Sequence, residues 1–111
     1  MEKYLLHKNV LEGNLKSVQE TIMGGAEPDE LDTFGHTALN WAVFGGYYDI
    51  VQALLESGAN PNIISEDGVT SRWRAQNFGL IEVEKLLISY GGKVEIENLS
   101  IRFKLSLNQG K

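Results

Sequence analysis

The stretch Asp32-Thr-Phe-Gly-His-Thr-Ala-Leu-Asn-Trp-Ala42 decides the fold, because a weaker copy returns as Ser65-Glu-Asp-Gly-Val-Thr-Ser-Arg-Trp-Arg-Ala75. The two copies share a glycine, a threonine and an alanine at matching positions, with Gly35 returning as Gly68. The same 33-residue spacing also extends backward, since Gly46, Gly58 and Pro61 correspond to Gly13, Gly25 and Pro28. Repeats of this length indicate an array of stacked helix pairs. Such arrays bind other macromolecules more often than they catalyse reactions.

Residues 32–64 form the clearest repeat, and their pattern predicts two short helices. Thr37 is placed to cap the first helix, because its hydroxyl can accept a hydrogen bond from a backbone N–H two or three residues later. Gly35 lets the preceding turn adopt positive φ, and Gly58 does so where the second helix ends. Apolar residues at helical spacing form one stripe on the second helix: Ile50, Val51, Leu54 and Leu55. Helices of about ten residues are marginally stable alone, so we expect them to be stabilised by stacking.

This pattern resembles the ankyrin repeat. The matching residues are Asp32, Gly35, Thr37-Ala-Leu39-Asn, Ala42, Gly46, Ile50-Val51, Leu54-Leu55 and Gly58-Ala-Asn-Pro-Asn62. Alanine at 38, asparagine at 40 and tyrosine at 47 depart mildly from the family motif. The resemblance covers about residues 3–93 and implies an all-α solenoid of about three helix-turn-helix repeats. We expect repeats at about 3–31, 32–64 and 65–93, followed by a β tail at 94–111.

Length and composition fit a single domain with a modest core. The chain has 111 residues and no cysteine, which excludes disulfides and thiolate metal sites. Its first eight residues mix acids and bases where a secretory signal needs an apolar run, and no apolar stretch approaches the ~20 residues of a membrane span. We therefore expect a soluble cytoplasmic protein that does not bind membranes.

No catalytic or metal-binding pattern is evident. His7 and His36 lie in different repeats, without a carboxylate or hydroxyl at a recognised triad spacing. The acidic run at 27–32 lacks the central glycine and the twelve-residue frame of an EF-hand. We expect neither enzymatic activity nor a cofactor nor a bound metal.

Charge is unevenly distributed along the chain. Residues 1–97 contain 15 acids and 7 bases, whereas residues 98–111 contain three bases and no acid. Many acids lie in the predicted turns between repeats: Glu27, Asp29, Glu30, Asp32, Glu66 and Asp67. The resemblance implies that these turns border a concave binding face. An acidic face favours a basic protein partner and argues against nucleic acid, although turn acids also serve solubility alone.

The resemblance also implies which positions select a ligand. The predicted partner-binding residues in repeats two and three are Thr33, Phe34, His36, Phe44, Glu66, Asp67, Val69, Arg74, Asn77 and Phe78. Phe44 and Phe78 lie one position apart in register, so we expect them in one patch unless a ring turns into the core. The spacing of Trp41 from Leu39 and Phe44 favours packing within or between repeats over ligand contact.

The third repeat carries charge where an internal repeat would be apolar. Arg72 replaces Leu39 and Glu84 replaces Val51 in register. Isolated buried charge is costly, so we expect this side to be open to water, with Arg72 and Glu84 paired. The neighbours Trp73 and Arg74 have two interpretations: a capping aromatic beside a solvated cation, or an interface anchor.

The tail alternates apolar and polar residues with the period of a β-strand. Its apolar positions are Leu99, Ile101, Phe103, Leu105 and Leu107. One solution is a hairpin turning near residues 98–100 and packed on the last repeat. The others are pairing with a second chain, either a copy of this protein or the ligand, and disorder. The oligomeric state expected is thus a monomer or a tail-mediated dimer.

Two functional hypotheses follow. In the first, the chain binds and neutralises its partner, because small acidic ankyrin proteins resemble bacterial immunity proteins that bind toxins. In the second, it is an adaptor or scaffold that links partners without inhibiting them.

Overall fold

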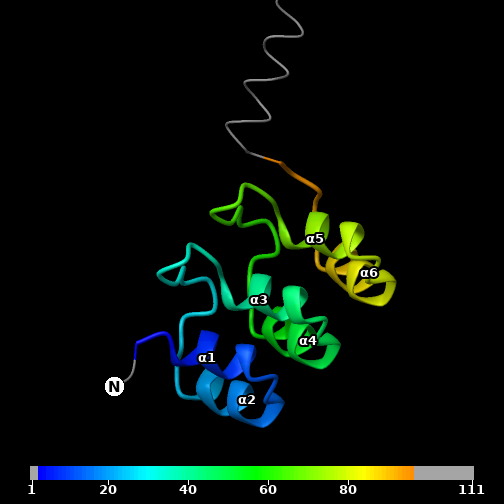
Figure 1. Ribbon diagram of the computed structural model, residues 1–111. Coiled ribbons are helices and arrows are strands. Elements are labelled where there is room, and N and C mark those ends of the chain that lie inside the picture. The colour runs from blue at the N-terminus through cyan, green and yellow to red at the C-terminus, as the bar shows by residue number, and fades with distance from the viewer. Residues whose placement is uncertain (1–2, 97–111) are drawn as a thin grey trace, which may run out of the picture.

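Six helices form three stacked pairs in residues 3–96, the part of the chain that the computed structural model describes. Figure 1 shows the pairs in chain order, with the longer loops before α3 and α5 projecting from the same side. The arrangement confirms the predicted helical solenoid, and each expected repeat contains one helix pair. The helices are α1 (Leu5–Leu11), α2 (Leu15–Met23), α3 (Ala38–Gly45), α4 (Tyr48–Glu56), α5 (Ser71–Asn77) and α6 (Ile81–Ser89).

The first helices of repeats two and three begin as the sequence predicts. The hydroxyl oxygen of Thr37 accepts a hydrogen bond of 3.0 Å from the backbone N–H of Asn40. Thr70 occupies the same place one repeat later and caps α5 through the N–H of Trp73, at 3.4 Å. The turn before α3 requires Gly35, because its φ is +76° and an added Cβ would lie 3.1 Å from the Glu66 carboxylate. The repeated loops are therefore set by local residues as well as by stacking.

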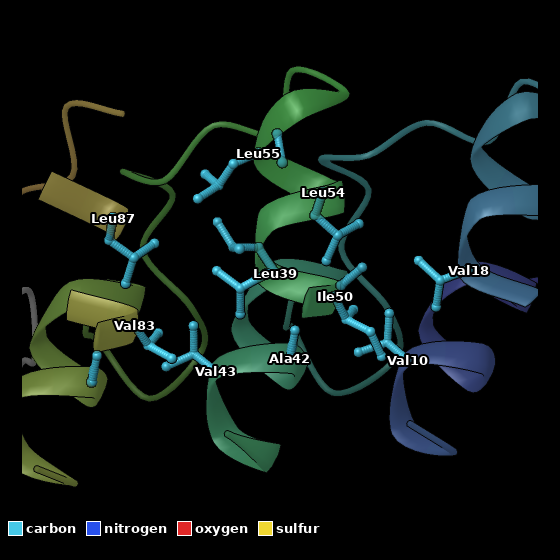
Figure 2. Close-up of a cluster of buried hydrophobic side chains, with 14 of the residues drawn as sticks. Val10, Val18, Leu39, Ala42, Val43, Ile50, Leu54, Leu55, Val83 and Leu87 are labelled. Carbon is cyan, nitrogen blue, oxygen red and sulfur yellow. The ribbon is translucent and has the colours of Figure 1, made fainter. Parts of the chain in front are cut away.

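The core runs continuously through all three repeats. Figure 2 shows side chains from successive pairs pointing toward one another, with Leu39 and Val43 of α3 lying between the other two repeats. These two residues and Leu54 of α4 are at most 1% exposed. Burying a side chain of this kind contributes about 1.5–3 kcal/mol, so each interface between repeats supplies stability that a single pair lacks.

A hydrogen bond between repeats recurs with the 33-residue spacing. The backbone N–H of Asn60 donates to the side-chain carboxylate of Asp29, and that of Lys93 donates to the side-chain oxygen of Asn62, each at 2.8 Å. The two donors occupy equivalent positions in successive repeats, and so do the two acceptors. The loop after each pair is thus held to the preceding repeat in the same way.

At the far end of the stack, Arg72 and Glu84 form the predicted pair. The Arg72 Nε lies 3.3 Å from the Glu84 carboxylate, and their side chains are 28% and 22% exposed. Just beyond α6 the chain turns back to repeat three, where Val69 and Ile96 form an isolated antiparallel bridge. The described residues contain no further β structure. The predicted strand or hairpin at 97–111 lies outside them.

The start of α1 differs from those of α3 and α5. Tyr4 stands one repeat before Thr37, provides no side-chain cap, and adopts a left-handed φ of 62°. Nearby, His7 is 3% exposed; its Nε2 lies 2.8 Å from the Glu30 carbonyl oxygen, whereas its buried Nδ1 has no hydrogen-bond partner. A residue without glycine's freedom is strained in this conformation. The first repeat is therefore less well stabilised at its start than the other two.

Replacing Tyr4 by threonine is expected to raise the free energy of unfolding by about 1 kcal/mol, since a capping hydroxyl becomes available and the left-handed conformation is no longer needed. Urea unfolding followed by tryptophan fluorescence measures the change. Tyr4→Gly is the control, because glycine tolerates the left-handed conformation but supplies no hydroxyl. If the threonine variant is no more stable than the glycine variant, the missing cap is not the cause.

Candidate functional site

The loops before α3 and α5, together with α1, α3 and α5, form one side of the array, here termed the loop face (Figure 1). Seven of the predicted partner-binding residues are exposed in its loops or at the ends of its helices: Thr33, Phe34, Phe44, Glu66, Asp67, Asn77 and Phe78. This face carries the aromatic residues that a folded core does not require.

Four rings in mutual contact cross the loop face, and we term Phe34, Trp41, Phe44 and Phe78 the aromatic strip. Their successive ring centroids are 6.3, 5.9 and 5.7 Å apart, all in edge-to-face geometry. Phe34, Phe44 and Phe78 are 69%, 56% and 48% exposed. The expectation that Phe44 and Phe78 share a patch is confirmed, and the strip joins repeat two to repeat three.

Trp41 holds one end of the strip in place. Its ring packs against the core, as predicted, while its indole Nε1–H donates to the Asp32 carboxylate at 2.7 Å. The same carboxylate accepts the backbone N–H groups of Phe34 at 3.0 Å and His36 at 3.1 Å. One aspartate therefore fixes both the loop that carries Phe34 and the ring on which Phe34 rests.

Phe44, inside the strip, rests on a buried cation, and here the expectation of a solvated Arg74 needs correction. Arg74 is 5% exposed, so it is neither a solvated side chain nor an accessible anchor. Its guanidinium donates to the Asp67 carboxylate at 2.5 Å and to the side-chain oxygen of Asn40 at 2.9 Å. It also lies 5.6 Å from the centroid of the Phe44 ring. Arg74 thus supports the strip from beneath.

Val69 is also unsuited to direct contact, because it is 5% exposed and forms the bridge to Ile96. His36 is half-buried, where its Nδ1 makes a short contact with the side-chain amide of Asn40 and its ring lies 4.7 Å from that of Trp41. Asn77 is exposed, and its amide donates to the Trp73 carbonyl at 2.8 Å. His36 and Asn77 border the strip without forming its centre.

The loop acids divide into two groups. Asp29, Asp32 and Asp67 accept hydrogen bonds that hold the loops, as described above. The glutamates, by contrast, have exposed side chains: Glu27, Glu30 and Glu66. Glu66 belongs to the loop of repeat three, and its backbone N–H donates to the Gly35 carbonyl at 2.9 Å, which places it beside the Phe34 loop. The negative charge available to a partner therefore comes from these glutamates and from the half-exposed Asp67.

The aspartates that organise the loops also have shifted pKa values. Burial alone would raise the pKa of Asp32, but hydrogen bonds from Trp41, His36 and Phe34 outweigh this effect and lower it. Burial would likewise raise the pKa of Asp67, yet hydrogen bonds from Ser65 and Arg74 and the charge of Arg74 bring its pKa below the ordinary value. Both groups favour the ionised form when the loops are folded.

These pKa values predict that stability falls in acid. A carboxyl group with a lower pKa in the folded state binds protons more readily when unfolded, so its contribution is complete above the ordinary value of about 3.9 and is lost progressively as the pH falls from there through the lower folded-state pKa. Urea unfolding at pH 7 and pH 3 is expected to show this loss, and Asp32→Asn should show a smaller difference between the two pH values. An equal difference in both proteins would mean that Asp32 does not contribute. Glu56→Gln, at an exposed site on α4, is the matched control.

From the sequence we expected Trp41 only to pack within or between repeats, and Arg74 to be either solvated or an interface anchor. The two residues occupy the same position in successive repeats, and each donates to a carboxylate in its own loop, Asp32 or Asp67. Their equivalent positions could have indicated this shared role from the sequence, because both residues have long side chains with an N–H donor. This equivalence indicates that this position supports the loop face.

Within residues 3–96, no group of three or more histidine, cysteine, aspartate or glutamate residues is arranged to hold a metal ion. Among the helices described, none has both the length and the apolar character needed to cross a membrane. A hollow of about 930 Å³ lies at the first-repeat end, where its lining includes Tyr4, His7 and Asn9. It is separate from the aromatic strip.

Known proteins with similar sequences and folds contain the same repeat. A putative ankyrin repeat protein of fowlpox virus, FPV222, is 32% identical over 90 residues, which cover 80% of this chain and 12% of that protein. The human protein phosphatase 1 regulatory subunit 27 is 38% identical over 63 residues, covering 57% of this chain and 41% of the subunit. The chain thus spans less than half the length of these relatives.

The fold comparison agrees with the sequence comparison. An ankyrin repeat domain from Acinetobacter baumannii superposes with a TM-score of 0.77 and 35% identity, covering 79% of this chain and 47% of that one. The ankyrin repeat domain of human ASB11 gives a TM-score of 0.75 at 27% identity, covering 83% of this chain and 42% of that domain. The family model for three copies of the ankyrin repeat matches residues 6–98. The chain therefore belongs to the ankyrin repeat family, whose members generally mediate interactions between proteins.

Proposed function

We propose that this chain binds a basic protein through its loop face, with the aromatic strip supplying the anchoring contacts. The observation that carries the proposal is the exposure of three phenylalanine rings in one connected strip, at 69%, 56% and 48%. Exposed aromatic clusters are typical of binding surfaces, and aromatic residues supply much of the energy at protein interfaces. The underlying hydrogen bonds of Asp32 and Arg74 favour this function further, since a rigid surface loses less entropy on binding.

Charge supports a basic partner. Glu66 places exposed negative charge beside the Phe34 loop, Glu27 and Glu30 add exposed acids elsewhere in the loop before α3, and the chain carries a net charge of −5. A positively charged protein would be attracted to this face and would associate faster at low ionic strength. The same charge disfavours nucleic acid, whose phosphate backbone requires a positive surface. One relative is named a regulatory subunit of protein phosphatase 1, a name consistent with action through another protein.

Binding to the partner would have one of two consequences. As an immunity protein, the chain would cover the active surface of a basic toxin in the cytoplasm and block its activity. As an adaptor, it would hold two partners at once and inhibit neither. The first role predicts one partner whose activity disappears on mixing, and the second predicts a ternary complex. The chain would act either as a monomer or as a dimer that pairs through its tail.

Affinity capture from the source cell, followed by mass spectrometry, tests the proposal directly. The expected result is a basic protein that is retained by the wild-type chain and associates more slowly as salt increases from about 0.05 to about 0.5 M, values of the order at which surface charges become screened. An acidic or neutral partner, or an association rate independent of salt, would contradict the electrostatic part. An activity assay of the captured protein, with and without this chain, separates the immunity role from the adaptor role.

A further inference from the structure

A second surface feature lies at the junction of repeats two and three, away from the projecting loops. It is a shallow groove of about 650 Å³, lined by residues from the two short turns between paired helices and from the starts of α4 and α6. This volume falls within the ~300–1,000 Å³ range of sites that bind small groups. The groove is lined by Gly46, Tyr48, Leu80, Ile81, Glu82 and Val83.

The equivalent place between repeats one and two is occupied by an aromatic ring from the chain itself. The ring of Tyr47 lies against Gly13, so closely that a Cβ added to Gly13 would be 3.0 Å from the Tyr47 Cζ. Its other edge lies against Gly45, where an added Cβ would be 2.8 Å from the Tyr47 Cδ2. Two glycines thus make room for one phenol ring at the first junction.

At the second junction the same ring is missing. Leu80 stands one repeat after Tyr47, and Gly46 stands one repeat after Gly13. The nearest atom to a Cβ added at Gly46 is the Leu80 Cδ2, at 3.8 Å, so the space over this glycine is more open. Phe78 replaces Gly45 in register, and its side chain contacts Phe44 instead, with 5.7 Å between ring centroids. The groove exists because a smaller residue stands where the first junction has a tyrosine.

The walls of the groove suit an apolar ring with a positive neighbour. Ile81 is 65% exposed and Tyr48 is 41% exposed, so both side chains are accessible to a partner at this junction. Acids flank them in the first turns of both second helices, Asp49 on α4 and Glu82 on α6. Glu82 lies 3.5 Å from Lys85, but this pair is largely exposed and contributes little, so a partner's cation could replace it.

We propose that this groove binds an aromatic side chain of a protein partner, with a lysine or arginine of the same segment facing Glu82. The ring would lie over Gly46, between Tyr48 and Ile81, as Tyr47 lies over Gly13 one repeat earlier. This contact is additional to the aromatic strip, which ends at Phe78, two residues before Leu80. A single partner segment could therefore occupy both surfaces in succession.

The test uses three short peptides and amide chemical shifts of the ¹⁵N-labelled full chain. The probe is acetyl-Lys-Tyr-Lys-amide, with acetyl-Lys-Ala-Lys-amide lacking the ring and acetyl-Glu-Tyr-Glu-amide reversing the charge. The expected result is saturable shifts at Gly46, Tyr48 and residues 80–83 with the first probe, none of comparable size with the alanine probe, and at least threefold weaker binding with the glutamate probe. Equal shifts with the lysine–tyrosine and alanine probes would overturn the proposal.

Two variants of the same helix provide the control. Ile81→Ser removes the most exposed wall of the groove and is expected to weaken binding of the tyrosine probe at least fivefold. Ile88→Ser removes an apolar side chain of comparable exposure, 47%, from the last turn of α6 and should leave the affinity unchanged. Equal weakening in both variants, or none in Ile81→Ser, contradicts the assignment.

A third variant of this chain tests whether the groove and the loop face are separate binding sites. The variant Phe34→Ala/Phe44→Ala lacks two rings of the aromatic strip but retains every residue that lines the groove. It is expected to bind the tyrosine probe with wild-type affinity even if it no longer binds the captured partner. Loss of the probe shifts in this variant would mean that the peptide binds the strip and that the groove is not a separate site.

Discussion

Replacing Phe34 and Phe44 together by alanine is expected to weaken binding of the captured partner by about 2 kcal/mol or more, roughly a 30-fold rise in Kd. Both rings are mostly exposed, so their removal costs the fold little, whereas a partner that covers them buries both. Isothermal titration calorimetry with the purified partner measures the change. A circular dichroism melt confirms that the variant remains folded.

Met23→Ala is the matched control for this prediction. Met23 is 86% exposed and lies at the end of α2, outside the loop face, so its removal deletes a comparable apolar side chain elsewhere. We expect wild-type affinity in this variant. If the double phenylalanine variant also binds with wild-type affinity, the aromatic strip is not the binding surface and the proposed function loses its main support.

Replacing Arg74 by alanine is expected to lower the free energy of unfolding by about 2–4 kcal/mol, because a fully buried ion pair that loses one partner costs about 3–5 kcal/mol. The change removes the donor to Asn40, the ion pair with Asp67 and the packing against Phe44. The expected loss lies below the fully buried case, since the Asp67 side chain is 47% exposed and stays partly hydrated. Urea unfolding monitored by tryptophan fluorescence measures it.

Arg72→Ala is the control, because it measures how much stability is lost when another arginine of α5 is removed. Arg72 lies on α5 near Arg74 and pairs with Glu84, with both side chains partly exposed. Its removal is expected to cost about 1 kcal/mol or less. Comparable losses in the two variants would show that the buried network around Arg74 contributes no more than a surface pair. Arg74→Met should recover part of the loss, because it restores apolar contact beneath Phe44.

The helix starts and apolar stripes could be predicted because they depend on residues within one or two turns. Thr37 caps α3 through a residue three positions away, and Leu54 is buried because it repeats Ile50 at helical spacing. The 33-residue spacing then extended these local arguments from the clear central repeat to its weaker neighbours. The resemblance placed Phe34 and Phe44 at ligand-selecting positions but left open that a ring turns into the core; both rings are exposed.

The burial of Arg74 could not be predicted in this way, because its neighbours come from another repeat. Asn40 belongs to repeat two, and it meets Arg74 only after repeats two and three have stacked. A charged residue following a tryptophan looks exposed in the sequence, and nothing local shows that Asn40 and Asp67 satisfy its donors. The groove beside Leu80 was missed for a similar reason. It depends on comparing Tyr47 with Leu80 across two junctions, which matters only once the space around Gly13 is known.

The recurring bond from Lys93 to Asn62 has a consequence for engineering. Because Asn62 holds the backbone of Lys93 as Asp29 holds that of Asn60, the chain leaves repeat three in the same register as it leaves repeat two, so a grafted repeat beginning after Lys93 would start in the register of the array. Lengthening the protein would then require changes mainly at Arg72 and Glu84, where apolar substitutes would receive the incoming helices. The array could thereby be enlarged into a broader recognition scaffold without redesign of its first two units.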